Sequence, residues 1–242
     1  MSGTLVTSPA DPAAPAGLDA RWLGRVPYDD ALALQARLVA DRRAGRVADR
    51  LLLLEHDHVI TLGTSAHREH VLLDANERRL LGIALYETGR GGDVTYHGPG
   101  QLVGYPIIDL KPDRCDLHRY VRDLETVLMH ALGDFGILAN RIRGLTGVWV
   151  GNRKVAAIGV RVSSGWITSH GFALNVATNL ALFDAIVPCG IRDRGVTNMT
   201  LETRLAPTMR EVAECVHTHF CAVFGRTASR LRDASANPTG RT

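Results

Sequence analysis

The chain has 242 residues and a formal net charge of +3 at pH 7; 45% of its residues are hydrophobic and 22% are charged. This size and composition are typical of a soluble globular protein with a full core, and no apolar run approaches the roughly 18 residues of a membrane span. The mild positive charge, without a run of lysines or aromatic residues, argues against a nucleic-acid partner.

Both ends of the chain have a composition that predicts disorder. Residues 1–17, MSGTLVTSPADPAAPAG, and residues 228–242 are rich in small and polar residues, so we expect one folded domain over residues 18–227. The N-terminus lacks the basic and apolar regions of a signal peptide, and four cysteines are too few for a disulfide framework. We therefore expect a cytoplasmic protein with free thiols and no membrane attachment.

The first half of the chain reads as a helix followed by strands. Residues 28–45 have apolar residues at helical spacing and end at a glycine. Short apolar runs predict strands at 50–56, which 58–63 would extend, and at 82–88 and 101–110.

The second half contains the clearest helix, at 116–136, then three strands between 147 and 176, then a helix at 208–225. Strands precede and follow the central helix without regular alternation of strand and helix. The fold class we predict is therefore α+β, with a mixed sheet flanked by helices, and not a doubly wound fold.

A glycine-rich stretch, RGGDVTYHGPGQLVGYP, occupies residues 90–106. It matches neither the dinucleotide-binding pattern nor the phosphate loop, so its glycines need not indicate a nucleotide. Glycines let backbone and ligand approach closely, and Arg90 and His97 could orient a polar head group. A hairpin with tight turns is the alternative.

Cys189 stands between Pro188 and Gly190 in AIVPCGIRD, residues 185–193. Proline restricts the backbone and glycine frees it, so this setting can hold a thiol at the mouth of a pocket. An ordinary turn after the preceding apolar run is equally compatible with the local sequence.

Four motifs in the same order resemble the lipoyl(octanoyl) transferase family. They are the glycine-rich stretch, GVWVGNRKVAAIGVRV at 147–162, TSHGFALNV at 168–176 and FDAIVPCGI at 183–191. The resemblance covers roughly residues 20–202. It implies a fold similar to the catalytic domain of biotin and lipoate protein ligases, and a single catalytic domain over 18–227.

The resemblance also implies the reaction and its partners. Such enzymes move an octanoyl group from acyl carrier protein to a lysine of lipoyl domains, those of 2-oxoacid dehydrogenase complexes and of the glycine cleavage H protein. They need no cofactor. Cys189 matches the acyl-accepting nucleophile and Lys154 its partner. The matching acyl-binding residues are Arg90, Gly91, Gly92, Asp93, Val94, Thr95, Tyr96, His97, Ala157, Ile158, Gly159, His170, Gly171 and Phe172.

These residue types suit that chemistry. A thiol attacks as its thiolate, and an ammonium about 4 Å away would favour the thiolate by about 4 kcal/mol at an effective dielectric of about 20. Lys154 lies far from Cys189 in sequence, and a solvated lysine that opens a strand is its alternative role. His97 and His170 either assist the reaction or hydrogen-bond a polar pocket wall.

Three other functions compete with this one. An ATP-dependent lipoate or biotin ligase of the same fold needs no cysteine nucleophile, and a non-catalytic acyl-binding protein needs neither Cys189 nor Lys154. A thioesterase would differ only in letting water intercept the acyl enzyme. Five arginines near the motifs are either contacts for an acidic partner or ordinary solvated charge: Arg141, Arg143, Arg153, Arg192 and Arg194.

The run CVHTHFC at 215–221 contains four possible zinc ligands. On a helix, Cys215 and His219 share one face, and His217 and Cys221 share the opposite face. Ligands on opposite faces cannot converge on one ion, so we predict no metal site there.

Overall fold

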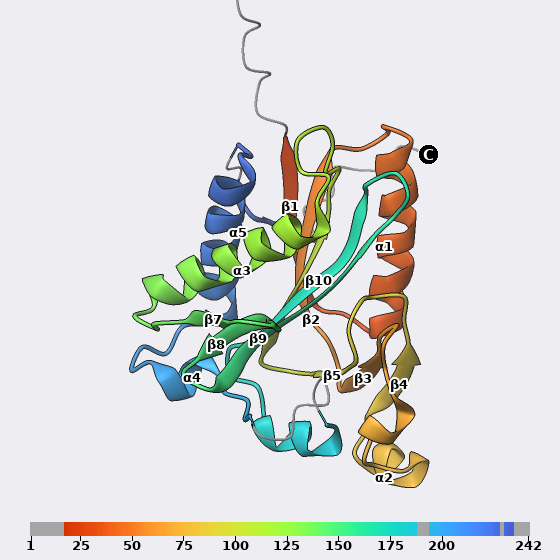
Figure 1. The fold of residues 1–242 in the computed structure, drawn as a ribbon, viewed down its shortest axis with the longest axis vertical. Coiled ribbons are helices and arrows are strands. Elements are labelled where there is room, and N and C mark those ends of the chain that lie inside the picture. The colour runs from red at the N-terminus through yellow and green to blue at the C-terminus, as the bar shows by residue number, and fades with distance from the viewer. Residues whose placement is uncertain (1–16, 188–193, 228–229, 235–242) are drawn as a thin grey trace, which may run out of the picture.

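The computed structural model describes residues 17–187, 194–227 and 230–234 (Figure 1). The expected tail at 1–17 lies outside the described residues apart from Gly17, as does Cys189. Within the expected tail at 228–242, residues 230–234 are described, and Arg232–Asp233 form a strand that pairs with Arg21 and Trp22, so these residues are ordered. Within the described part of the chain, no helix has both the length and the apolar character needed to cross a membrane.

A large mixed sheet forms the centre of the fold (Figure 1). Its eight strands run in the order β11-β1-β2-β6-β10-β9-β8-β7. β1 is parallel to β2 and β11, and the other neighbours are antiparallel. The bounds are β1 Leu18–Arg25, β2 Asp49–Glu55, β6 Gln101–Ile107, β7 Asn140–Ile142, β8 Leu145–Val150, β9 Arg153–Val162, β10 Thr168–Asn175 and β11 Arg232–Asp233.

Helices cover both faces of this sheet. α1 (Tyr28–Arg43) packs on one face, while α3 (Leu117–Asp134) and α5 (Met209–Phe224) pack on the other, as Figure 1 shows. The Asp116 side chain accepts hydrogen bonds from the backbone at the start of α3. A capping box of Thr208 and Glu211 begins α5, and Gly225 ends it in a left-handed conformation. Burial on both faces explains the unbroken leucine run of β2.

A second sheet of three strands lies beside the first, in the order β4-β3-β5. Its strands are β3 Val59–Leu62, β4 Ala84–Glu87 and β5 Val94–His97. α2 (Ala75–Leu80) joins β3 to β4, and short elements complete the chain: η1 Arg68–His70, η2 Leu180–Ala185 and α4 Met199–Glu202. A separate apolar cluster lies behind this small sheet and includes Tyr96 and Phe183.

The α+β class, the mixed sheet and the flanking helices are confirmed, one local expectation is wrong, and the alternative given for the glycine-rich stretch is not found. Residues 58–63 do not extend the strand at 50–56, because the chain leaves the large sheet at His56, whose ring bonds to Val26 O and to the Tyr105 hydroxyl, each at 2.7 Å. Residues 90–106 do not form a hairpin, because β5 pairs with β3 and β6 pairs with β2 and β10. The glycine-rich stretch thus connects the two sheets.

Candidate active site

A slot lies between β5 of the small sheet and strands β6, β9 and β10 of the large sheet. It consists of two cavities that share four lining residues, Val94, Thr95, Ala157 and Ala173. The first continues to a polar end, and the second reaches Lys154. We call the two cavities together the inter-sheet slot. Its apolar walls and few polar groups are typical of a small-molecule site.

The glycine-rich loop closes one side of the slot by approaching β9 at backbone distance. Gly91 N donates to Val160 O at 2.9 Å. A Cβ at Gly159 would stand 2.9 Å from Gly91 O and 3.2 Å from Arg90 Cδ, so a side chain there would push the loop outward. Part of the slot wall is therefore main chain.

Arg90 attaches the glycine-rich loop to strand β3. Its buried guanidinium donates to Thr61 O at 2.7 Å, to Thr61 Oγ1 at 2.9 Å and to Gly91 O at 3.1 Å. These contacts anchor the loop to β3. Arg90 is thus a structural anchor and a buried positive charge at the polar end of the slot.

His97 is held by Gln101 and is neutral at physiological pH. Gln101 Nε2 donates to Asn175 Oδ1 at 2.9 Å and to Tyr96 O at 3.2 Å, so its Oε1 accepts from His97 Nδ1 at 2.7 Å. Burial, with the neighbouring His56, lowers the pKa of His97 to about 3. The ring is therefore protonated on Nδ1, and Nε2 is an acceptor.

His170 stands at the same end with an unusual backbone. Its φ is 55°, in the left-handed region that few non-glycine residues occupy, and its backbone N–H donates to Gln35 Oε1 at 2.8 Å. Burial, with the nearby Arg90, lowers the pKa of His170 to about 4. Like His97, it contributes a neutral imidazole to the slot.

Two tyrosines complete the polar end. Burial raises the pKa of Tyr28 to about 12 and raises that of Tyr105 well above the ordinary tyrosine value. Because His56 Nδ1 donates to Val26 O, its Nε2 accepts from the Tyr105 hydroxyl. The wall therefore offers neutral polar groups around Arg90.

Lys154 is buried at the other end of the slot, on β9. Its ammonium lies 4.8 Å from the centroid of the Trp149 ring, a cation–π distance. Its backbone pairs with the chain that follows the undescribed segment: Lys154 N donates to Gly195 O and Thr197 N donates to Lys154 O, each at 2.9 Å. A third cavity, toward the start of α3, also reaches Lys154.

A chain of hydrogen bonds links the two ends of the slot. His97 donates to Gln101, Gln101 donates to Asn175, and Asn175 Nδ2 donates to Thr197 O at 3.0 Å. Thr197 is the residue whose N–H bonds to the backbone of Lys154. The polar end and the lysine end are thus parts of one connected structure.

Most of the predicted substrate-binding residues line the slot's first cavity: Arg90, Gly92, Asp93, Val94, Thr95, His97, Ala157, Ile158, Gly159, His170, Gly171 and Phe172. Gly91 lines the third cavity beside it. Tyr96 lines none of the cavities described here, because strand alternation turns it into the small-sheet core, where its hydroxyl lies 2.7 Å from His58 Nδ1.

Cys189 lies outside the described residues, so its position is not part of this geometry. Two of the three described cysteines are poor nucleophiles: burial raises the pKa of Cys215 to about 12 and also raises the pKa of Cys221. Neither lines the inter-sheet slot.

Sequence reasoning missed several residues that build the site. Tyr28 and Tyr105 line it, while Gln101 and Asn175 connect its ends. Glu125, on α3, is fully buried and accepts from Arg141 Nε at 2.7 Å and from Gly147 N at 3.1 Å. A Cβ at Gly147 would stand 3.5 Å from Lys154 Cε, so Gly147 lies beside the lysine side chain. Gln101 and Asn175 lie inside two of the quoted motifs, and this position was the sequence feature that could have marked them as site residues.

The helical reading of CVHTHFC is confirmed. His217 and Cys221 are buried and contact each other at 3.3 Å, while Cys215 and His219 face α3. Among the five arginines proposed for an acidic partner, Arg141 pairs with Glu125 and Arg153 with Glu202. Arg192 lies outside the described residues.

Solved structures share this fold. Lipoate-protein ligase A bound with ATP superposes with a TM-score of 0.68 at 20% identity, over 90% of each chain. Biotin protein ligase from Aquifex aeolicus, in complex with biotin and ATP, gives 0.51 at 16% identity, over 86% of this chain and 70% of that one. At these identities the likeness concerns the architecture.

Sequence relatives are much nearer. An octanoyltransferase of Solibacter usitatus is 53% identical over 84% of this chain and 91% of its own length, and one of Rubrobacter xylanophilus is 54% identical over 88% and 97%. The family described as "Lipoyl protein ligase A/B catalytic domain" matches residues 27–221. The chain therefore belongs to the lipoyl protein ligase A/B catalytic-domain family, within its octanoyltransferase group.

Proposed function

We propose that this chain carries an octanoyl group from acyl carrier protein to the side-chain amine of a lysine in lipoyl domains, with Cys189 as the intermediate carrier and Lys154 as its partner. The acceptors would be the lipoyl domains of 2-oxoacid dehydrogenase complexes and the glycine cleavage H protein. The reaction would take place in the cytoplasm and use no cofactor.

The arrangement around Lys154 carries this proposal. The slot's second cavity is lined by Lys154, by Phe183 and by Val196. Phe183 precedes the undescribed segment that contains Cys189, and Val196 follows it. The chain that leaves this segment pairs with the backbone of Lys154, and Phe183, before the segment, lines the same cavity as the lysine. This supports a cysteine–lysine pair at the mouth of an apolar slot.

The first half of the reaction makes an acyl enzyme. The Cys189 thiolate attacks the thioester carbonyl of the octanoyl carrier, the new carbon–sulfur bond forms, and the bond to the carrier sulfur breaks. The carrier sulfur leaves as a thiolate and takes the proton of the Lys154 ammonium, so Lys154 enters the second half as a neutral amine. Lys154 as an ammonium would stabilise the attacking thiolate and supply positive charge near the developing oxyanion.

The second half passes the acyl group to nitrogen. The neutral amine of the lipoyl-domain lysine attacks the Cys189 thioester, an amide bond forms, and the Cys189 sulfur leaves. The amine loses one proton, which Lys154 would take in its neutral form. A thioester is exchanged first for a thioester and then for an amide, so the sequence runs without an added energy source.

The two histidines and two tyrosines at the far end of the slot are neutral, and the Arg90 guanidinium there is hydrogen-bonded to Thr61 and Gly91, so this end is compatible with an uncharged alkyl chain. His97 and His170 have pKa values of about 3 and 4 because they are buried, and the two tyrosines keep their protons. Among the described residues, Asp93 is the one carboxylate that lines the first cavity, and it accepts a hydrogen bond from His70 Nδ1 at 2.5 Å. This supports a substrate-binding role for the slot.

The decisive experiment is intact-mass analysis of the chain after mixing with octanoyl carrier protein. We expect one octanoyl group on Cys189, which moves to a lipoyl domain on its addition. Acylation at Cys115, Cys215 or Cys221, or undiminished transfer by Cys189→Ala, would overturn the mechanism. Loss of the acyl group to water at an unchanged rate with the lipoyl domain present would indicate a thioesterase.

The ATP-dependent ligase is the nearest alternative, because its fold is shared. Transfer assays with an ATP-degrading enzyme and a chelator present distinguish the two. We expect the untreated rate from octanoyl carrier protein. A requirement for ATP with free octanoic acid would assign the chain to the ligases instead.

A further inference from the structure

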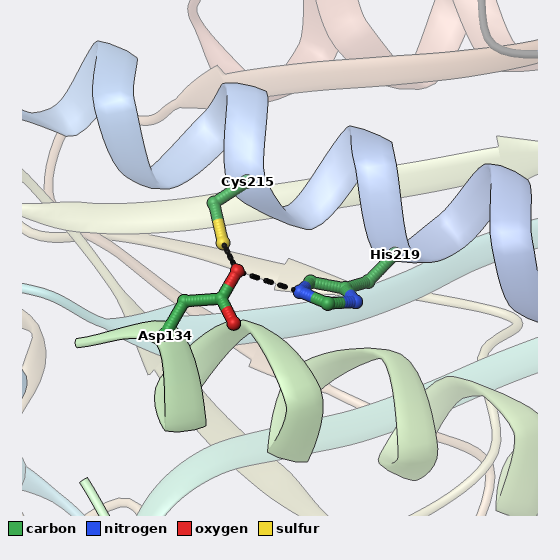
Figure 2. Close-up of side chains that lie close together, drawn as sticks. All are labelled: Asp134, Cys215 and His219. Carbon is green, nitrogen blue, oxygen red and sulfur yellow. Dashed lines mark hydrogen bonds and ion pairs between the residues drawn. The ribbon is translucent and has the colours of Figure 1, made fainter. Parts of the chain in front are cut away.

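Three ligand-bearing side chains meet between α3 and α5, on the helical layer away from α1. Asp134 lies in the last turn of α3, and Cys215 and His219 lie one turn apart on α5 (Figure 2). Asp134 Oδ2 accepts from Cys215 Sγ at 3.3 Å and from His219 Nε2 at 2.8 Å. One ligand atom from each residue lies within 4.8 Å of the others.

A fourth ligand stands next to them. His130 precedes Asp134 by one turn of α3, and its ring centroid lies 5.5 Å from that of His219. The two helices therefore present matched pairs, each with its members four residues apart on one helical face. A pair of this spacing on each of two packed helices can surround one ion. The prediction of no metal site at 215–221 considered ligands from one helix alone, and it does not hold for Cys215 and His219, whose partner Asp134 comes from α3.

We propose that Asp134, Cys215 and His219 form a Zn²⁺ site that joins α3 to α5, with His130 as the fourth ligand. The donor set of one thiolate, one carboxylate and imidazole nitrogen is the set that Zn²⁺ takes, whereas Mg²⁺ and Ca²⁺ take oxygen ligands. On binding, the Cys215 S–H bond is replaced by an S–Zn bond and one proton is released to solvent.

The geometry of Asp134, Cys215 and His219 requires only small movements, and His130 would have to turn its ring toward them. Ligand bonds of about 2.0 to 2.3 Å in a tetrahedron place neighbouring ligand atoms about 3.3 to 3.8 Å apart. The contact of 3.3 Å between Cys215 Sγ and Asp134 Oδ2 lies at the start of that range, and the contact of 2.8 Å between His219 Nε2 and Asp134 Oδ2 lies below it. Asp134 and His219 are partly exposed, so solvent and metal can reach the cluster. The site shares no residue with the inter-sheet slot.

The test is metal binding by the full-length chain in a Cys189→Ala background, which removes the proposed nucleophile as a competing thiol. We expect one Zn²⁺ per chain by calorimetry. Co²⁺ should give the visible bands of a tetrahedral ion and a thiolate charge-transfer band in the ultraviolet. At a hundredfold excess of free Zn²⁺ over its Kd, the melting temperature should rise by about 5 to 10 °C.

Ligand variants and a matched control distinguish this site from adventitious binding. Cys215→Ala and, separately, His219→Gln should each weaken Zn²⁺ binding by more than about tenfold, since the loss of even an outer-shell partner costs that much. Cys115→Ala with His118→Gln removes the same two residue types elsewhere on the chain and should leave binding unchanged. Metal-free circular dichroism shows that each variant is folded.

Several results would overturn the proposal. The first two are an unchanged Zn²⁺ affinity in both ligand variants and an absence of Zn²⁺ binding once Cys189 is replaced. The others are an octahedral Co²⁺ spectrum without the thiolate band, and a loss of Zn²⁺ affinity in the control variant as large as that in the ligand variants. None of these outcomes depends on acyl transfer, so the site and the proposed function can fail separately.

Discussion

Lys154 is the residue on which the proposed chemistry most depends. It is buried at one end of the slot and anchored through its own backbone to Gly195 and Thr197. Trp149 covers its ammonium. A lysine fixed in this way can act on a neighbouring thiol only within a narrow range of positions, so its charge and its proton can be tested separately.

Replacement of Lys154 by methionine keeps most of the length and removes the charge. Loss of a nearby cation disfavours the thiolate, so the pKa of the Cys189 thiol should rise, and the pH profile of alkylation should move upward. Lys154→Arg keeps the charge but cannot give up a proton near neutral pH, so acylation should partly survive while transfer fails. Alkylation rates against pH and single-turnover transfer measure both effects. Coincident alkylation profiles for wild type and Lys154→Met would contradict the pair.

His97 should make the protein less stable in acid. Because its folded pKa is about 3, below the ordinary value near 6.5, the unfolded chain binds the proton first, and stability falls as pH drops below about 6.5. Between about pH 7 and pH 5 this one group should cost about 2 kcal/mol of unfolding free energy.

The comparison variant for this effect is His97→Asn, whose amide can still donate to Gln101. Its stability should fall less steeply over the same pH range, and the remaining slope should reflect His170 and His56, whose pKa values are also lowered by burial. Urea unfolding at a series of pH values gives the comparison. Parallel curves for the two proteins would show that His97 does not carry the effect.

At the scale of elements, disturbing the close contact between the glycine-rich loop and β9 should lower the stability of the protein by a measurable amount. Gly159→Ala places a methyl group 2.9 Å from Gly91 O, and such overpacking should lower stability by about 1 to 3 kcal/mol. It should also slow acyl loading, because the loop forms one wall of the slot.

Gly133→Ala is the matched control for this change. Gly133 lies in α3, and a Cβ there would meet no atom within 4 Å. Alanine is favoured over glycine in a helix, so this variant should be neutral or more stable by up to about 1 kcal/mol. Thermal unfolding of both variants decides the matter; equal effects at positions 133 and 159 would mean that the loop contact is unimportant.

The helices were the most predictable elements. Asp116, Thr208 and Gly225 mark helix ends through local hydrogen bonds, so the predicted bounds at 116–136 and 208–225 agree with α3 and α5 within two residues. The small sheet was not predictable, because β3 pairs with strands that lie at 84–87 and 94–97 in the chain. Strand pairing over such separations leaves no local pattern.

The candidate site divides in the same way. Motif resemblance found Lys154 and most of the slot, while Tyr28, Gln101 and Asn175 acquire their roles only when α1, β6 and β10 meet. Asp134 was missed for the same reason. The shared helical face of Cys215 and His219 was predicted, but the residue that they contact comes from α3.

At the scale of the whole molecule, the positive net charge should favour an acidic protein as the acyl donor over a small neutral thioester. The chain carries +3, and an acidic carrier protein would be steered toward it at low ionic strength. We expect added salt to lower kcat/KM for octanoyl carrier protein more than kcat/KM for a small neutral octanoyl thioester. Equal slopes for the two donors across ionic strength would show that long-range attraction plays no part in docking.

Ala157 and Ala173 are register partners on β9 and β10, so their methyl groups lie side by side on one face of the large sheet, and both border the two cavities of the slot. Val94 and Thr95 of β5 are the other residues that border both cavities, so the cavities meet between these two side chains and the two methyl groups. An unbranched alkyl chain passes such a constriction, whereas a methyl branch beside the carbonyl meets it directly. We therefore expect the slot to select acyl chains by their width more strictly than by their length. In direct competition, 2-methyloctanoyl thioesters should acylate the enzyme more slowly than octanoyl thioesters.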